Sequence, residues 1–129
     1  MLKLKSIHHL AIISSDYEVS KHFYTKILGL RILNEVHRTD RRSHKLDLLV
    51  NGKYQIELFS FSNPPERVSR PEARGLRHLA FEVDNLIESI NELNINGVMT
   101  EEIRMDEFTG KKFVFFSDPH GLPIELYES

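Results

Sequence analysis

The sequence contains an internal repeat, and a repeat constrains the architecture of a chain more than any other feature. His9-Leu10-Ala11-Ile12 returns as His78-Leu79-Ala80-Phe81, 69 residues further on. Each copy closes on the same tripeptide, Ile56-Glu57-Leu58 in the first and Ile124-Glu125-Leu126 in the second. The two halves therefore align with a single one-residue gap, and each contributes one histidine and one glutamate at matched positions. The pattern indicates a duplicated module.

Both halves show the pattern of a βαβββ module. Asp16 is a suitable N-cap for an amphipathic helix, and Gly29 stands where a glycine commonly ends a helix. Gly97 takes the same place in the second half. Asn51-Gly52 is a strong signal for a hairpin between two strands. The predicted strands cover residues 7–14, 30–38, 45–50, 54–61, 76–83, 98–105, 112–117 and 122–127.

We expect these modules to form a single α+β domain over residues 1–129, since a chain of this length is one ordinary domain. Module one covers about 1–61 and module two about 75–129. Residues 62–74 are rich in proline and arginine, which is typical of a linker.

Composition excludes several classes of protein. A net charge of −2 gives no reason to expect a nucleic-acid partner. No apolar run approaches the ~18 residues of a membrane span. The first seven residues are not followed by the apolar segment and cleavage site of a signal peptide, so we expect a cytoplasmic protein. The chain has no cysteine, which excludes disulfides and thiolate chemistry. Any metal must be held by nitrogen and oxygen.

Strand alternation places the repeated histidines and glutamates on the less apolar face of each predicted sheet. His9, Glu57, His78 and Glu125 all lie opposite the more apolar side that should pack on the helices. Ionisable groups there need water, a partner or a cation, and two imidazoles with two carboxylates suit Ni, Co, Zn, Fe or Mn. The alternative is four unrelated polar residues on solvated strands. Repetition of the same pair in both halves favours the metal site.

Nearly the whole chain resembles the vicinal oxygen chelate superfamily, which groups glyoxalase I, extradiol dioxygenases, methylmalonyl-CoA epimerase and fosfomycin- and bleomycin-resistance proteins. The resemblance rests on His9 seven residues before Asp16, on the Phe23-Tyr24 and Leu28-Gly29 signature of the first helix, on the segment 75–81, and on the segment 116–121 leading into Glu125. It implies two βαβββ modules whose curved mixed sheets enclose a metal site.

The ligand order His, Glu, His, Glu is similar to that of glyoxalase I (lactoylglutathione lyase) of the short bacterial type, which prefers nickel or cobalt. The resemblance implies one divalent metal per site, held by His9, Glu57, His78 and Glu125. It further implies proton transfer on a chelated, hemithioacetal-like hydroxy-carbonyl through an enediolate. Glu125 is then the base, and Glu57 is a ligand and second proton carrier.

Two positions depart from the glutathione-using pattern and leave the substrate open. Ile13 and Phe61 stand where those relatives carry an arginine and an asparagine. The arginines of the linker or of the first half can instead bind an anionic substrate. The alternative is that these arginines are solvated surface residues. These arginines are Arg41, Arg42, Arg67, Arg70 and Arg74.

Three other functions stay open. An epimerase or isomerase of another hydroxy-carbonyl would keep the metal and ignore glutathione. A ring-cleaving dioxygenase would need iron and an open position, which the second glutamate argues against. A non-enzymatic ligand-sequestering protein would need no metal.

Each module has only four strands and cannot close around a ligand alone. The resemblance therefore implies a two-fold homodimer with shared active sites. The 13 residues of the linker are long enough for the modules to pair within one chain or across two.

Overall fold

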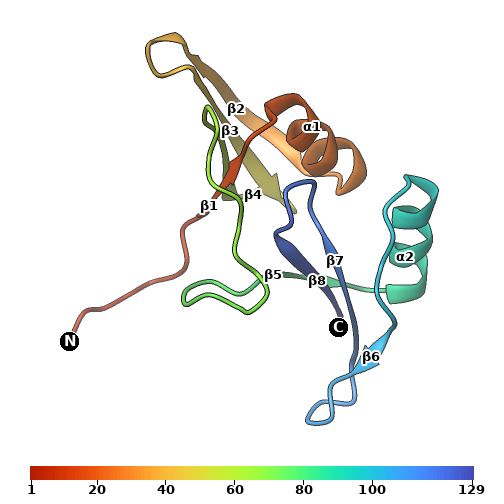
Figure 1. Cartoon of the computed structure of the whole chain (residues 1–129). Helices are drawn as coiled ribbons and strands as arrows, with labels where there is room; N and C mark the ends of the chain where they lie inside the picture. The colour runs from red at the N-terminus through yellow and green to blue at the C-terminus, as the bar shows by residue number, and fades with distance from the viewer. The chain divides into compact units, whose positions relative to one another are not determined.

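The computed structural model describes the backbone of residues 1–129 and every side chain except that of Arg41. The chain divides into two compact units, Met1–Pro65 and Glu66–Ser129. In Figure 1 the first runs from red to yellow-green and the second from green to blue. The division falls inside the predicted linker 62–74. That the 129 residues act as one domain stays a prediction.

The first unit is a four-stranded mixed sheet with a helix. Its strand order is β1-β4-β3-β2, in which β1 and β4 are parallel and the other pairs are antiparallel. The elements are β1 (Leu10–Ser14), α1 (Tyr17–His22) with a π-helical continuation (Phe23–Ile27), β2 (Arg31–Arg38), a 3-10 turn (Thr39–Arg41), β3 (Ser43–Val50) and β4 (Lys53–Ser60).

The second unit repeats this topology. Its order is β5-β8-β7-β6, again with one parallel pair, β5 and β8. The elements are β5 (Leu79–Val83), α2 (Leu86–Ile95), β6 (Arg104–Met105), β7 (Lys112–Ser117) and β8 (Pro123–Glu128). The predicted α+β fold of two βαβββ modules is confirmed, and both sheets are open. No helix in the described chain has the length and apolarity to cross a membrane.

The local signals act as expected. Asp16 Oδ1 accepts a hydrogen bond from the Val19 amide at 3.2 Å and starts α1, and the Asn85 side chain does the same for α2. Asn51 and Gly52 both have positive φ, 48° and 79°, as a type I′ hairpin turn requires. The two cap side chains each satisfy a backbone N–H that the first turn of a helix leaves without a partner. Asn51 and Gly52 tolerate the positive φ of the turn.

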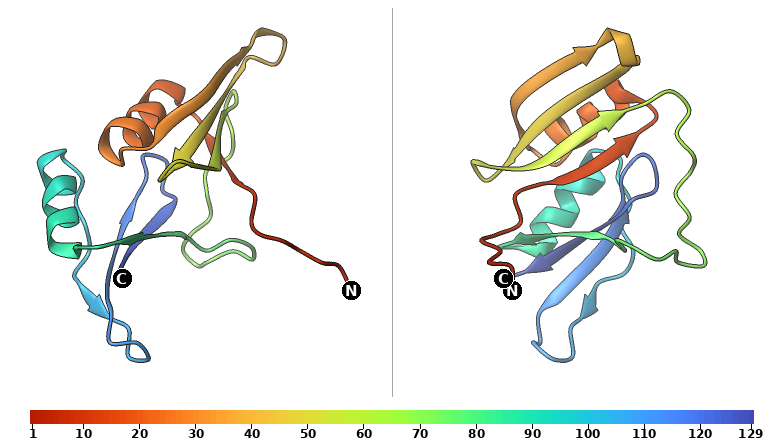
Figure 2. Two further views of the ribbon diagram at one scale, coloured as in Figure 1. Left: turned by 180° about the vertical axis from the view of Figure 1, so that it is seen from behind. Right: turned by 90° about the vertical axis from the view of Figure 1, so that its left-hand side faces the viewer.

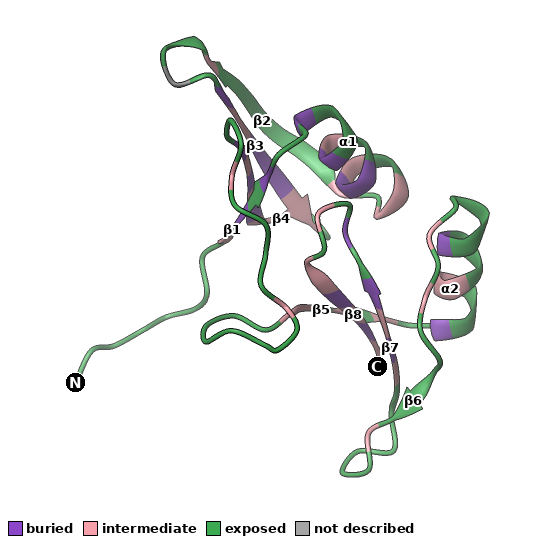
Figure 3. Ribbon diagram, in the orientation of Figure 1, coloured by how far each residue is buried: buried purple, intermediate pink, exposed green. Residues whose placement is uncertain are grey.

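The core of each unit lies between its helix and one face of its sheet (Figure 2). Burial alternates along β4 and β8, so that apolar residues point toward the helix (Figure 3). The helices contribute the buried Phe23, Tyr24, Leu86 and Leu93. The buried sheet residues are Leu46, Leu48, Ile56 and Leu58 in the first unit and Val114, Phe116, Ile124 and Leu126 in the second. The predicted apolar faces are confirmed.

Some predicted strands are shorter than expected. β1 begins at Leu10 and β5 at Leu79, because their ladders start with the pairs Leu10↔Ile56 and Leu79↔Ile124. Of the predicted strand 98–105, only Arg104–Met105 forms a strand, β6. Strand formation needs a partner as well as an apolar pattern. The consequence for function is that His9 and His78 each precede their strand by one residue.

Candidate metal centre

Each unit brings its own histidine and glutamate together. In the first unit His9 Nε2 lies 3.4 Å from Glu57 Oε2, and in the second His78 Nε2 lies 2.9 Å from Glu125 Oε2. The cause is the same in both. Parallel pairing sets Ala11 opposite Glu57 and Ala80 opposite Glu125, and each histidine precedes that alanine by two residues. Residues two apart share a face, so the pair are diagonal neighbours.

The donors of these pairs fit a divalent cation. Both carboxylates are largely enclosed, with side chains 13% and 12% exposed for Glu57 and Glu125. His78 Nδ1 is buried and has no hydrogen-bond partner among the described residues. A neutral imidazole that donates from one nitrogen presents a lone pair on the other, and leaving that nitrogen buried and unpaired costs free energy. In both pairs the nitrogen that faces the carboxylate is Nε2, so Nε2, and not the unpaired Nδ1 of His78, would be the metal donor.

One pair alone is a small site, with one nitrogen and one oxygen donor. Within the described part of the chain, no three His, Asp or Glu side chains are grouped so as to hold a metal. The structure thus brings His9 to Glu57 and His78 to Glu125. That the two pairs share one ion stays a prediction.

Glu57 sits in a polar network. Tyr54 donates from its hydroxyl to Glu57 Oε1 at 2.5 Å, and Lys45 Nζ lies 3.4 Å from the same oxygen. Lys45 also pairs with Asp47 at 3.1 Å. Burial by itself would raise the pKa of Glu57, but the Tyr54 hydrogen bond, Lys45 and His9 together outweigh it and hold the pKa below its usual value. Glu57 is therefore a firmly held carboxylate.

Tyr54 reaches this face because of a β-bulge that sequence reasoning missed. β3 and β4 pair Leu48 with Ile56 and Leu49 with Tyr54, so that Gln55 is an extra residue. The signal for it was in the sequence. A regular hairpin turning at Asn51-Gly52 would set Leu48 opposite Gln55 and drive a polar residue into the core. The bulge restores Ile56 to the core and moves Tyr54 to the side of Glu57.

His8, an exposed residue, also lies beside this site. Alternation along the predicted strand 7–14 places His8 on the opposite face from His9, but pairing begins only at Leu10, so no ladder fixes the face of His8. His8 Nδ1 lies 2.8 Å from His9 Nδ1. The rings of both histidines contact that of Tyr54, with His9 stacked on it at 5.8 Å.

Glu125 has different surroundings. Its cross-strand neighbour is Phe115, where Glu57 has Asp47. The His78 ring packs edge-on against Phe115 at 5.0 Å, and Phe113 packs edge-on against Phe115 at 6.0 Å. The sequence could not say which pair of β7 aromatic positions faces the core. The structure buries Val114 and Phe116 and leaves Phe113 and Phe115 on the face of Glu125.

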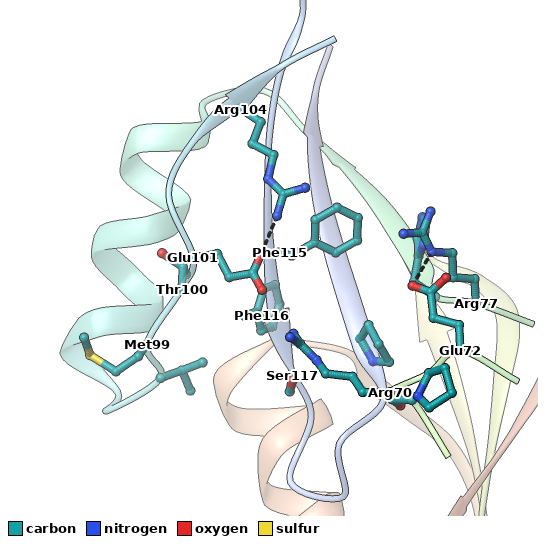
Figure 4. Close-up of a pocket in the computed structure, with 15 residues that line it drawn as sticks. Arg70, Glu72, Arg77, Met99, Thr100, Glu101, Arg104, Phe115, Phe116 and Ser117 are labelled. Atoms are coloured by element: carbon teal, nitrogen blue, oxygen red, sulfur yellow. Dashed lines mark hydrogen bonds and ion pairs between the residues drawn. The ribbon is translucent and has the colours of Figure 1, made fainter. Parts of the chain in front are cut away.

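The arginines of residues 62–74 divide by role. Arg67 donates to the carbonyl oxygens of Leu76 and Arg77 at 2.8 and 3.0 Å and holds the loop in shape. Arg70 lines a cavity of about 740 Å³ in the second unit (Figure 4), and Arg74 is exposed outside it. In the first unit Arg42 is exposed, and the side chain of Arg41 lies outside the described residues.

Comparison with known proteins gives matches over almost the full chain. The sequence profile of the Glyoxalase/Bleomycin resistance protein/Dioxygenase superfamily matches residues 6–126. The uncharacterized protein YwkD of Bacillus subtilis is 60% identical over 97% of this chain and 98% of its own. The crystal structure of a glyoxalase family protein from Enterococcus faecalis is 49% identical, with a TM-score of 0.88, and the match covers 96% of this chain and 98% of that one.

The descriptions of two further matches mention a metal. The metallothiol transferase FosB of Staphylococcus saprophyticus is 31% identical over 96% of this chain and 77% of its own. The fosfomycin resistance protein FosX of Listeria monocytogenes, in a mutant form complexed with Mn(II) and 1S,2S-dihydroxypropylphosphonic acid, has a TM-score of 0.77 over 98% of this chain and 94% of that one. At 17% identity the likeness to FosX is one of fold.

The Tyr54 hydrogen bond gives a testable pH dependence in the metal-free protein. Because the pKa of Glu57 lies below the usual 4.5, its ionised form stabilises the fold above pH 4.5, and that stabilisation is lost as pH falls through the folded-state pKa. Tyr54→Phe should raise the pKa of Glu57 and lower the free energy of unfolding above pH 4.5. The difference from wild type should shrink at lower pH.

Carboxyl ¹³C NMR titration and urea unfolding measure the two effects. Tyr127→Phe is the matched control, because Tyr127 lies on β8 and donates to Asp106. An unchanged Glu57 titration in Tyr54→Phe, or an equal shift in Tyr127→Phe, would contradict the assignment.

Proposed function

The chain belongs to the Glyoxalase/Bleomycin resistance protein/Dioxygenase superfamily, and from this premise we propose that it is a glyoxalase I-like, metal-dependent lyase or isomerase. Its substrate is a small hydroxy-carbonyl compound, such as a hemithioacetal. The observation that carries the proposal is the matched His–Glu pair of each unit, at 3.4 and 2.9 Å. Evolutionary duplication of a fold does not require an ionisable pair to recur at the same place, whereas a shared metal does.

We propose that His9, Glu57, His78 and Glu125 hold one divalent ion, with nickel or cobalt favoured over zinc, iron or manganese. The imidazole Nε2 atoms and carboxylate oxygens that face each other in the two pairs support this. The name of the FosB relative supports metal dependence in this family as well. When bound, the ion supplies the Lewis acidity that polarises the oxygens of a hydroxy-carbonyl.

The surroundings of the two glutamates support different roles. Tyr54 and Lys45 hold Glu57 ionised and in place, which suits a permanent ligand and makes it a weak base. Among the described side chains Glu125 pairs only with His78, and its cross-strand neighbour is the apolar Phe115. Glu125 is therefore freer to turn toward substrate. It takes the proton from one carbon on a carboxylate oxygen and returns it to the adjacent carbon.

A second candidate is an epimerase or isomerase of another hydroxy-carbonyl. Ile13 and Phe61, at the positions where glutathione-using relatives carry an arginine and an asparagine, are apolar and 55% and 38% exposed. They offer no charge-assisted or directional contact to a peptide thiol. Assaying hemithioacetals made from several thiols, beside hydroxy-carbonyls that contain no thiol, separates the two candidates.

Replacement of the base should affect turnover more than metal content. Glu125→Gln should lower turnover by ~10²–10⁴, the usual contribution of a positioned base, while the protein stays folded and keeps much of its metal. Glu82→Gln, at an exposed site on β5, should leave the rate unchanged. Steady-state kinetics with metal analysis of each preparation measure both. An undiminished rate in Glu125→Gln would remove it as the base and promote Glu57.

We further propose a homodimer in which the His9–Glu57 pair of one chain shares an ion with the His78–Glu125 pair of its mate. Each unit holds an open four-stranded sheet and one half of the ligand set. A complete set requires one unit of each kind, and exchange across a two-fold axis supplies two such sets.

Mixing inactive variants tests this sharing. His9→Ala and His78→Ala chains should each be inactive, and after subunit exchange a mixed dimer should regain one intact site and a fraction of wild-type activity. Native mass spectrometry confirms that exchange has occurred. If confirmed heterodimers stay inactive, all four ligands belong to one chain.

A further inference from the structure

The second unit contains a cavity beside His78 whose charged residues the proposed chemistry does not use. Its volume is about 740 Å³, within the range of small-molecule sites. Phe115 and Phe116 of β7 form one wall, and His78 is also among the residues that line the cavity. The loop that carries Ser69 and Arg70 closes another side (Figure 4). Every lining residue belongs to the second unit.

Three arginines line this cavity, and two of them are already paired. Arg77 Nε lies 2.9 Å from Glu72, and Arg104 Nη2 lies 2.9 Å from Glu101. Arg70 differs from both. Among the side chains that the structure describes, none makes a hydrogen bond or ion pair with Arg70. In Figure 4 its guanidinium reaches toward Phe116 and Ser117.

The loop around Arg70 is held in shape by Arg67. Arg67 Nε donates to Ser69 Oγ at 3.1 Å, and its Nη2 donates to the carbonyl oxygens of Leu76 and Arg77. These bonds tie the residue before Arg70 to the two residues before His78. Arg70 is therefore presented on a fixed loop, which lowers the entropic cost of using it to bind a ligand.

We propose that this cavity is an anion subsite, in which Arg70 binds a carboxylate or phosphate group of the substrate while the hydroxy-carbonyl end lies at His78. The placement of the hydroxy-carbonyl end at His78 rests on the proposed function, whereas anion binding by Arg70 does not. A guanidinium presents two parallel donors that match the two oxygens of such a group. With Glu72 and Glu101 pairing the other two arginines, the five charged residues carry a net charge of +1, which one anionic group neutralises.

The cavity thus explains how a chain without the glutathione contacts can still select a substrate. The aromatic wall covers the carbon skeleton, and Arg104, which lies 5.6 Å over the Phe115 ring, closes the same wall with its guanidinium. Recognition by Arg70 favours acids over neutral carbonyl compounds of equal size.

NMR of the metal-free full chain tests the subsite without reference to catalysis. Inorganic phosphate and acetate are titrated separately at constant ionic strength, with the Arg70 Nε–Hε signal and the amides of Phe115 and Ser117 as reporters. We expect saturable shifts of these signals. Saturation by both anions assigns a carboxylate-compatible subsite, and saturation by phosphate alone assigns a phosphate subsite.

Matched variants identify the residue that binds. Arg70→Gln should weaken binding by ~10-fold or more, because a charge-assisted hydrogen bond is lost, and Arg70→Lys should fall between it and wild type. Arg74→Gln removes the same charge from the same loop outside the cavity and should stay within about twofold of wild type. Equal losses in Arg70→Gln and Arg74→Gln, or the absence of saturable shifts in the cavity, would overturn the proposal. Because no metal is present, failure of the metal proposal would leave this result unaffected.

Discussion

The parallel pairing of the first and last strands of each module is the constraint on which the rest of this structure depends. It sets an alanine opposite the glutamate in both units, and so brings a histidine that lies far away in sequence to within 3.4 or 2.9 Å of that glutamate. The antiparallel strands alone would leave the histidines unplaced. The apolar side chains that alternate with these residues anchor each sheet to its helix, so the same strands build the core on one face and the site on the other.

The two halves carry the same His–Glu pair in different surroundings. The first pair is embedded among Tyr54, Lys45 and Asp47, and the second among phenyl rings with a cavity alongside. A fixed, ionised carboxylate suits metal retention, whereas a carboxylate with an apolar neighbour and one partner suits movement and proton transfer. Under the proposed function, the cavity beside His78 is where a substrate would meet Glu125. Division of labour between the halves follows from these neighbours.

Much of this was readable from the sequence, because the signals were local or repeated. Alternation predicted the buried Ile56 and Ile124, and the Asp16 cap and the Asn51-Gly52 turn are confirmed. Tyr54 was missed because its face depends on a bulge, which only the conflict between hairpin register and hydrophobic pattern reveals. Alternation did not predict that His8 lies beside His9, because strand pairing begins two residues later, at Leu10. Arg70 has no partner among the described side chains, whereas Arg77 and Arg104 pair with glutamates, and composition does not encode which arginines find partners.

The central claim is that the two His–Glu pairs bind one divalent ion together, and titration of the purified full chain with Ni²⁺ against a competing chelator tests it most directly. The account predicts one ion per chain. It also predicts that His9→Ala and His78→Ala each weaken binding by ~100-fold or more, since even the loss of a supporting outer residue costs 10–100-fold. His22→Ala, on the exposed side of α1, should bind as wild type. Unchanged affinity in either His9→Ala or His78→Ala would contradict the account, because the ion would then be held by other residues.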